Sequence, residues 1–295
     1  MAPSPKPTAD NNAKTDEGFV FAVSGKNYLP LAIRAAQTIR EHHPNHPIDL
    51  FSDQPCDAAV FDQVIPLEDA WFRPRFEALR RSRFTKSIVL DADIICVAPI
   101  GDVFELMDRF DLAAAHEPRR ASDLAVRHFQ TPVPAAFPQL NSGVVAIRKS
   151  PAVDAFFNKV ENAMKESKMN RDQPVVRTLL FESDLRLWVL PPEYNFMNID
   201  LLEAYSEQNG APRILHLTRL HRHFDTLNTK KQLHTVGAIC GPAIERHIAA
   251  LLASDRTLGG DGARVRPLFR QRLTGLARGL SQSLAKRLCR LSQRG

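Results

Sequence analysis

The chain has 295 residues, of which 44% are hydrophobic and 24% charged, so it is long enough for one large or two ordinary domains with a buried core. No apolar run approaches the roughly 20 residues that cross a bilayer, and the first residues lack the apolar segment of a secretion signal, which predicts a cytoplasmic protein. The four cysteines lie far apart without a Cys-x-x-Cys pair, which argues against a zinc knuckle or a disulfide framework.

The net charge of +6 is unevenly distributed along the chain. Residues 256–295 contain ten basic residues and a single acid, a charge of +9, which leaves −3 for the rest of the chain. The sequence therefore predicts a mildly acidic body followed by a basic appendage.

The first part of the chain alternates stretches typical of strands and helices. Residues 1–17 mix prolines and polar residues without periodicity and predict a flexible N-terminus. An apolar run of strand length at 18–23 precedes apolar residues at helical spacing over 29–39. Short apolar runs follow at 48–51 and 64–67. Strand, helix and strand in quick succession predict an α/β protein with a parallel sheet.

The stretch from Lys86 to Pro99 predicts the central strand of that sheet. Its two apolar runs are interrupted by Asp91 and Asp93. A buried carboxylate without a partner is strongly disfavoured, so this pair needs a cation, a basic side chain or water at the end of the strand. Two carboxylates beside a pocket suit Mg²⁺ or Mn²⁺, with a phosphate-bearing substrate completing the coordination. The alternative is a strand that runs into an exposed, Asp-rich turn.

The remaining elements continue the alternation. Residues 119–138 include three prolines without a clear period and are expected to be irregular. Residues 141–143 are expected to form an exposed polar bend that leads into a strand ending at Ile147. The other expected elements are helices at 76–83, 102–110, 151–164 and 173–180 and strands at 111–115, 187–190 and 213–217.

Several polar residues are expected at the carboxyl ends of strands, where ligands bind in open α/β sheets. Asp91 and Asp93 lie on the central strand, and His216 ends the last one. A histidine at the same edge fits as the third ligand of a divalent ion held by two carboxylates. The alternative for His216 is a structural role. His221 and His223 are near enough in the sequence that the choice among the three histidines stays open.

With these residues in place, residues 18–224 resemble the GT-A nucleotide-sugar glycosyltransferases, and look most like the family 8 type of the glycogenin and lipopolysaccharide galactosyltransferase group. The resemblance rests on the order and spacing of several motifs, namely Leu90-Asp-Ala-Asp93, Leu140-Asn-Ser-Gly-Val144, Asp172-Gln-Pro174, Leu190-Pro-Pro-Glu-Tyr-Asn195 and Ile214-Leu-His216. It implies a Rossmann-like GT-A fold with a mixed, mostly parallel sheet. It also implies metal-dependent transfer of a hexose from a nucleoside diphosphate sugar, with uridine as the nucleoside, to a glycan or lipid-linked acceptor with retention.

The resemblance further implies how the metal and the nucleotide are bound. Asp91, Asp93 and His216 would hold Mn²⁺ or Mg²⁺ against the nucleoside diphosphate. The residues implied near the base and ribose are Ala22, Ser24 and Tyr28.

Other residues are implied around the donor sugar and the phosphates. Asn141, Asp172 and Gln173 would face the sugar, with Asp172 or Gln173 steadying the developing sugar cation. Arg75, with Arg73, would add positive charge beside the phosphates. The alternative for the arginines is a solvated helix start, and that for Asp172 is a helix cap.

One segment departs from the family pattern. In that family the metal-binding histidine opens a segment with a Gly and a Lys-Pro-Trp ending, whereas residues 217–223 contain neither. Arg219 or Arg222 would then replace the Lys as phosphate partner. This departure keeps open the alternative of a catalytically degenerate protein that binds nucleotide sugars. A sugar nucleotidyltransferase is less favoured, because residues 24–27 are too short for its phosphate loop.

The end of the chain predicts a domain at 18–254, a glycine-rich linker at 255–263 and a basic amphipathic tail at 264–295. In the tail, Phe269 and six leucines recur every three or four residues among basic side chains. Such a helix suits an anionic membrane, where each Lys or Arg contributes about 1 kcal/mol, and the alternative is packing on protein. Nucleic acid is not an expected partner, because the tail has few aromatic residues. We therefore expect a cytoplasmic protein that is peripheral on the inner membrane face.

Overall fold

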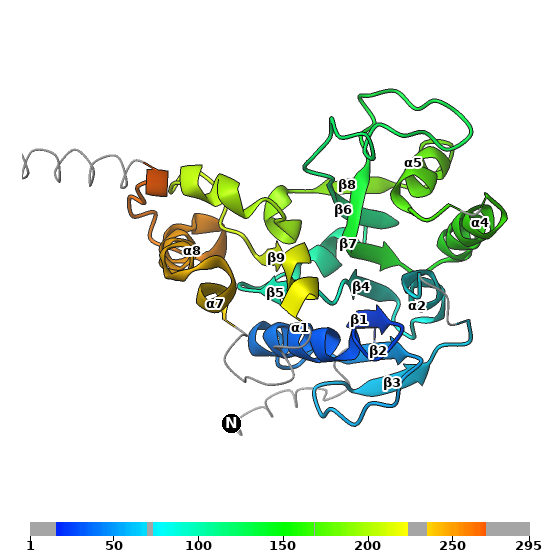
Figure 1. Cartoon of the computed structure of the whole chain (residues 1–295), viewed down its shortest axis with the longest axis horizontal. Coiled ribbons are helices and arrows are strands. Elements are labelled where there is room, and N and C mark those ends of the chain that lie inside the picture. Colours follow the sequence, from blue (N-terminus) through cyan, green and yellow to red (C-terminus); the bar gives the residue numbers. More distant parts are fainter. Residues whose placement is uncertain (1–15, 70–72, 168, 224–234, 270–295) are drawn as a thin grey trace, which may run out of the picture.

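The computed structural model describes residues 16–69, 73–167, 169–223 and 235–269 (Figure 1). A seven-stranded sheet forms its centre, and four of the six strand pairings in it are parallel. The strands, in sheet order, are β3 (Gln63–Pro66), β2 (Ile48–Ser52), β1 (Glu17–Val23), β4 (Lys86–Leu90), β7 (Leu140–Arg148), β6 (Leu112–His116) and β8 (Leu187–Leu190). The mixed, mostly parallel α/β fold is as predicted.

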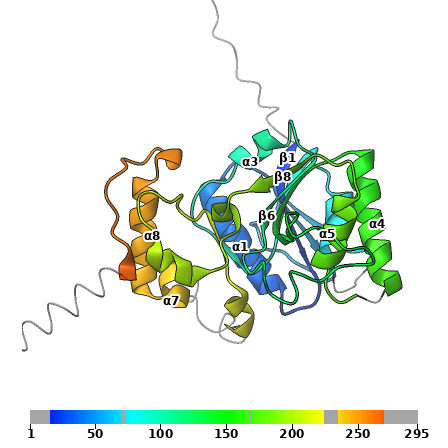
Figure 2. The same cartoon turned by 90° about the horizontal axis from the view of Figure 1, so that it is seen from above.

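Helices cover both faces of this sheet, because its strands present apolar side chains in both directions. Phe19 and Phe21 of β1 pack with α1 (Leu29–His42) and α3 (Asp102–Leu106). Val20 packs on the opposite face with α2 (Arg75–Arg81), α4 (Pro151–Ser167) and α5 (Gln173–Phe181). Figure 2 shows α4 and α5 on one side of the sheet and α1 on the other. Successive side chains of β1 thus point to opposite faces of the sheet, and both faces are covered.

A smaller unit lies beyond α1 (Figure 2). Its two-stranded sheet pairs β5 (Ile94–Cys96) with β9 (Ile214–His216) in antiparallel register. A third apolar cluster joins this sheet to helices that lie before and after β9 in the chain. They are η2 (Ile199–Ala204), η3 (Thr218–His223), α7 (Val236–Cys240), α8 (Pro242–Ser254) and η4 (Arg256–Leu258), and η1 (Pro192–Asn195) precedes η2.

The prediction of one central strand through Lys86–Pro99 is wrong. The chain leaves the large sheet after Leu90 and enters the small one at Ile94, so Asp91 and Asp93 lie in the connecting turn. The backbone N–H of Asp91 still donates to Gly143 O of the large sheet at 2.9 Å, whereas Asp93 O accepts from Leu217 N beside the small sheet at 2.8 Å. The two carboxylates thus stand at the junction of the two sheets.

The polar bend predicted at residues 141–143 is also wrong. These residues belong to β7, which runs antiparallel to β4, and Asn141 is buried. The helix predicted at 102–110 ends at Leu106 and continues as turns. The irregular segment 119–138 is confirmed, since it forms turns and a single isolated bridge.

The chain after α8 folds back onto that helix. Gly260 N donates to Asp255 O at 2.8 Å, Gly262 N donates to Ser254 O at 3.0 Å, and Val265 and Leu268 join the third apolar cluster. The predicted domain limits stay a prediction, and most of the predicted tail, 270–295, lies outside the described residues, as do residues 1–15. None of the described helices combines the length and apolarity that crossing a bilayer requires.

Candidate active site

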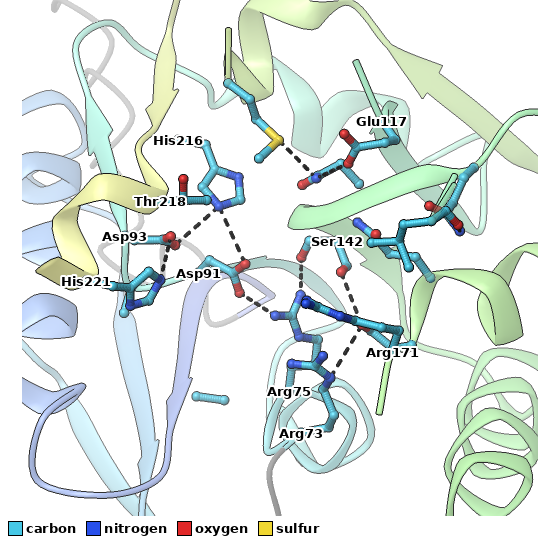
Figure 3. Close-up of a pocket in the computed structure, with 18 of the residues that line it drawn as sticks. Arg73, Arg75, Asp91, Asp93, Glu117, Ser142, Arg171, His216, Thr218 and His221 are labelled. Atoms are coloured by element: carbon cyan, nitrogen blue, oxygen red, sulfur yellow. Dashed lines mark hydrogen bonds and ion pairs between the residues drawn. The ribbon is translucent and has the colours of Figure 1, made fainter. Parts of the chain in front are cut away.

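One cavity of about 960 Å³ opens where β1, β4 and β9 end (Figure 3). β1 and β4 are neighbours from which the strand order proceeds in opposite directions, the position at which open α/β sheets bind ligands. All of the residues predicted as metal-binding, nucleotide-binding or catalytic line this cavity. They are Ala22, Ser24, Tyr28, Arg75, Asp91, Asp93, Asn141, Asp172, Gln173 and His216.

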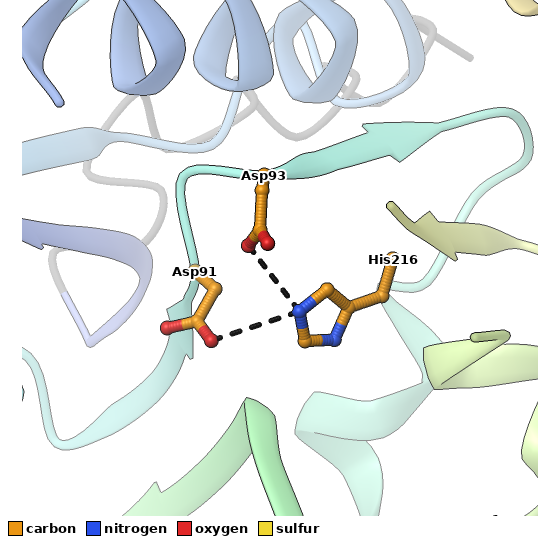
Figure 4. A group of neighbouring side chains, drawn as sticks. All are labelled: Asp91, Asp93 and His216. Atoms are coloured by element: carbon orange, nitrogen blue, oxygen red, sulfur yellow. Dashed lines mark ion pairs between the residues drawn. The ribbon is translucent and has the colours of Figure 1, made fainter. Parts of the chain in front are cut away.

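Asp91, Asp93 and His216 form a cluster with the composition of a metal site (Figure 4). The Nε2 atom of His216 lies 3.2 Å from Asp93 Oδ1 and 3.8 Å from Asp91 Oδ2. One ligand atom from each residue lies within 4.8 Å of the other two. The register of the small sheet, which pairs Ile94 with His216, brings the histidine to the carboxylates. Asp93 and His216 are buried, whereas Asp91 is partly open to the cavity.

His221 contacts the same cluster from its exposed side. Its Nε2 lies 2.8 Å from Asp93 Oδ2, and its ring meets that of Tyr28 edge-on at 5.6 Å. Burial acts to raise the pKa of Asp93, but the nearby imidazoles of His216 and His221 outweigh it and hold this pKa well below its usual range. The side chain of His223 lies outside the described part of the chain.

A second charged group faces the cluster across the cavity. Arg75 places Nη2 2.7 Å from Asp91 Oδ1 and donates from Nη1 to the Ser142 carbonyl at 2.5 Å. Arg73 places Nε 3.4 Å from Asp172 Oδ1, and Ser142 Oγ donates to Asp172 Oδ2 at 3.1 Å. Figure 3 shows Arg73 and Arg75 below Asp91 and Ser142. The predicted alternative of a solvated helix start is therefore wrong for Arg75, whose side chain is 16% exposed.

Asp172 precedes α5 without capping it, because its side chain makes no cap hydrogen bond. Burial acts to raise its pKa, but Arg75 and Arg73 outweigh this and lower it. Asp172 is therefore held as a carboxylate in the cavity wall. The neighbouring Gln173 lines the same wall and is half-buried.

The protein family of this region follows from a comparison with known families. The family model of nucleotide-diphospho-sugar transferases matches residues 86–232, which include Asp91, Asp93 and His216. This part of the chain belongs to the nucleotide-diphospho-sugar transferase family. The chain is thus a transferase, as the resemblance predicted, although a search of the curated proteins found no match to its sequence.

Solved structures resemble the transferase in fold at low sequence identity. The apo form of the glycosyltransferase GlyE from Streptococcus pneumoniae TIGR4 has a TM-score of 0.51 and 18% identity, over 80% of this chain and 64% of that one. The galactosyltransferase LgtC in complex with donor and acceptor sugar analogues has a TM-score of 0.48 and 13% identity, over 71% and 94%. Mouse xyloside xylosyltransferase 1 has a TM-score of 0.44 and 14% identity, over 68% and 97%.

The predicted nucleotide-binding residues of the transferase lie where β1 ends. Ser24 Oγ donates to Asp53 Oδ2 at 2.7 Å, and Gly25 N donates to Asp53 Oδ1 at 2.8 Å. Gly25 has φ = 84°, so a residue with a side chain would be strained in this turn. Tyr28 is 43% exposed at the cavity mouth. Ala22 and Tyr28, on either side of this turn, thus line the cavity.

The sequence analysis missed several residues that build the site. Glu117 follows β6 and accepts from Asn141 Nδ2 at 2.8 Å, and Asn195 Nδ2 donates to Asn141 Oδ1 at 2.8 Å. Glu117 could have been predicted in the same way as Asp91, because ligands bind at the carboxyl ends of strands and Glu117 follows the strand predicted at 111–115. Asn195 ends one of the motifs that carry the family resemblance, but no role was assigned to it. Arg219, by contrast, was predicted as a phosphate partner, but it donates to Ile239 O at 3.4 Å and lies outside the set of residues lining the cavity, and the side chain of Arg222 lies outside the described part of the chain.

Proposed function

We propose that the transferase is metal-dependent and moves a hexose from a uridine diphosphate sugar to a glycan or lipid-linked acceptor, with retention of the anomeric configuration. The observation that carries this proposal is the cluster of Asp91, Asp93 and His216 in the wall of the large cavity, with Arg75 beside it. A nucleoside diphosphate needs charge neutralisation on its phosphates, and this part of the cavity supplies it from both an ion site and a guanidinium.

The donor set fits a divalent ion. Two carboxylates and one imidazole offer two hard oxygen ligands and one nitrogen ligand, which suit Mn²⁺ and also Mg²⁺. Metal–oxygen bonds in such sites are about 2.0–2.6 Å long, so ligand atoms that lie within 4.8 Å of one another can share one ion. The partial exposure of Asp91 leaves the cluster accessible from the cavity, where phosphate oxygens would complete the coordination.

Each group has a role in this proposal. Asp91, Asp93 and His216 would hold the ion, which stabilises the negative charge that develops on the diphosphate as the sugar leaves. Arg75 holds Asp91 in place and adds its own positive charge to the same region. Positive charge at this place lowers the activation barrier to the extent that it stabilises the transition state more than the bound donor.

The other wall of the cavity would receive the donor sugar. Asp172 is kept ionised by Arg73 and Arg75, and a fixed carboxylate stabilises a developing sugar cation. Gln173 lines the same region and supplies a neutral polar group for the hydroxyls of the sugar, whereas the amide of Asn141 is engaged by Glu117, Gly143 and Asn195. Ala22, Ser24 and Tyr28, at the end of β1, would contact the base and ribose.

The experiment that tests this function is unfolding of the purified chain in the presence of nucleotide sugars with and without Mn²⁺. A ligand at 100 times its dissociation constant stabilises the native state by about 2.7 kcal/mol. We expect this stabilisation with a uridine diphosphate sugar and Mn²⁺ together, and release of the nucleoside diphosphate once an acceptor is supplied. Asp93→Asn should abolish both. Undiminished stabilisation and release in Asp93→Asn would refute the metal site, and binding without release under any acceptor would favour the degenerate binding protein.

We further propose that residues 264–295 bind an anionic membrane surface and bring the transferase to lipid-linked acceptors on the cytoplasmic side of the inner membrane. The support is the one-sided charge of the sequence after Asp261, which packing on protein does not require. Sedimentation with vesicles that contain anionic lipid tests this proposal. Replacing the four basic residues in 286–294 with Gln should weaken binding up to about 1000-fold, because each contributes about 1 kcal/mol and the four together contribute about 4 kcal/mol. Equal sedimentation of both proteins would refute it.

A further inference from the structure

Beneath the proposed metal ligands, a chain of buried hydrogen bonds connects Glu117 to His216. Asn141 Nδ2 donates to Glu117 Oε2 at 2.8 Å, and Asn195 Nδ2 donates to Asn141 Oδ1 at 2.8 Å. Asn195 Oδ1 then lies 2.9 Å from His216 Nδ1. Asn141, Asn195 and His216 are each at most 5% exposed. Buried polar groups of this kind are costly unless every donor meets an acceptor, so the orientation of each amide can be deduced from its neighbours.

The orientation of Asn141 is fixed by two partners whose character cannot change. The carboxylate of Glu117 can only accept, and the backbone N–H of Gly143, 2.9 Å from Asn141 Oδ1, can only donate. Turning the Asn141 amide over would place an oxygen against the carboxylate and an NH₂ group against the N–H. Both contacts would be repulsive, so Asn141 must present Nδ2 to Glu117 and Oδ1 to Gly143 and Asn195.

The same reasoning fixes Asn195 and then His216. Asn141 Oδ1 is an acceptor, so Asn195 must face it with Nδ2 and therefore faces the histidine with Oδ1. An amide oxygen at 2.9 Å from a ring nitrogen requires a hydrogen on that nitrogen. Nδ1 of His216 therefore carries hydrogen, and in the neutral ring the lone pair lies on Nε2. This is the nitrogen that faces Asp91 and Asp93 in Figure 4.

We propose that Asn195 is a positioning residue that holds His216 in the Nδ1–H form, so that Nε2 presents its lone pair to a divalent ion shared with Asp91 and Asp93. This inference rests on the proposed metal dependence for its consequence, although the hydrogen-bond chain itself does not. In this proposal His216 is supported from behind by a buried partner on Nδ1. The ring nitrogen opposite a metal ligand commonly has such a partner, and losing it costs about 10- to 100-fold in metal affinity.

The first test needs no metal and no substrate. The full chain, labelled with ¹⁵N and freed of metal, is studied by NMR at a pH at which the ring of His216 is neutral, and its ring nitrogens are identified by their loss in His216→Gln. We expect the hydrogen on Nδ1 and the free lone pair on Nε2. A hydrogen on Nε2 in the wild-type protein would overturn the proposal, whatever any variant does.

The second test compares Mn²⁺ binding by titration calorimetry in matched variants. Asn195→Leu removes the acceptor for Nδ1–H and should weaken Mn²⁺ binding about 10- to 100-fold. Asn195→Asp keeps an oxygen opposite Nδ1 and should restore the Nδ1–H form and part of the affinity, although its second oxygen faces Asn141 Oδ1 and should lower the free energy of unfolding. Equal Mn²⁺ affinity in Asn195→Leu and the wild-type protein would overturn the positioning role. If the wild-type chain binds no Mn²⁺, the proposed metal dependence fails, and the NMR result alone then decides on the hydrogen-bond chain.

Discussion

Gly143→Ala is expected to remove His216 from the proposed metal site. A Cβ atom on Gly143 would lie 2.3 Å from both Cε1 and Nδ1 of His216 and 3.1 Å from Asn141 Oδ1. Ordinary contacts of a Cβ begin near 3.4 Å, so the ring has to move away by about 1.1 Å or β7 has to shift. Metal–ligand distances tolerate only about 0.2 Å, so a displacement of this size breaks the bond to Nε2.

The effect can be measured as the stabilisation that Mn²⁺ gives against denaturant. At a Mn²⁺ concentration 100 times the wild-type dissociation constant, the wild-type free energy of unfolding should rise by about 2.7 kcal/mol. A variant that binds 100-fold more weakly should gain only about 0.4 kcal/mol under the same conditions. Without metal, the extra methyl group should itself cost about 1–3 kcal/mol, because it overpacks a buried site.

Gly101→Ala is the matched control. Gly101 also lies against a buried histidine ring, but its Cβ would lie 3.4 Å from Cε1 of His43, an ordinary contact, and its φ of −65° suits any residue. This variant should keep the full gain from Mn²⁺. If Gly143→Ala also kept the full gain, the position of the His216 ring would be irrelevant to metal binding, and the reasoning would be refuted.

Three further predictions concern other parts of the structure. Arg75→Lys should weaken nucleoside diphosphate binding about tenfold in a titration, because one ammonium cannot hold both Asp91 and the Ser142 carbonyl as the guanidinium does, and unchanged affinity would contradict this. Burial lowers the pKa of His43 to about 4, so the unfolded state binds more protons as the pH falls below 6.5. The wild-type free energy of unfolding should therefore decrease by up to about 3 kcal/mol between pH 6.5 and pH 4, and urea unfolding of His43→Gln should show a smaller decrease. Gly260→Ala should lower this free energy by about 1–3 kcal/mol, because its Cβ would lie 2.5 Å from the Ala253 carbonyl oxygen, and a thermal melt with no decrease would mean that residues 255–268 do not pack on the domain.

The elements that could be predicted from the sequence are those whose pattern is local. The helical spacing over residues 29–39 and the apolar run at 18–23 correspond to α1 and β1 because the buried faces of these elements are visible in the order of their own residues. The helix predicted at 151–164 corresponds to α4, and its start is also determined locally, because Ser150 Oγ accepts from Val153 N at 3.3 Å.

The break between β4 and β5 could not be predicted, because the residues on both sides of Asp91 and Asp93 are equally apolar. Which sheet a strand joins depends on partners far away in the sequence. Leu90 pairs with Val144, whereas Ile94 pairs with His216. The carboxylates were correctly placed beside a cavity, but the reason is a junction between two sheets rather than the end of one strand.

Asn141 was misplaced for a different reason. Asn and Ser favour exposed turns when nothing else is known, which made a polar bend the natural interpretation of residues 141–143. In the structure the Asn141 amide is buried because Glu117, Gly143 and Asn195 satisfy it, and two of these partners lie 24 and 54 residues away. A single sequence does not show such partners. The resemblance to a family implied that Asn141 faces the donor sugar, which stays a prediction, and in the structure Asn141 is among the residues that line the cavity.

The junction between the two sheets has a consequence for how the protein is made. Asp91 and Asp93 follow a strand of the large sheet, whereas His216 belongs to the small sheet and is synthesised more than 120 residues later. The nascent chain therefore carries an incomplete ligand set until β9 has left the ribosome and paired with β5. An ion bound by all three residues would act as a clip that closes one of the longest loops in the chain, and such clips restrict the unfolded ensemble most when the loop is long. Such an ion would then hold the two sheets together as well as serve the reaction.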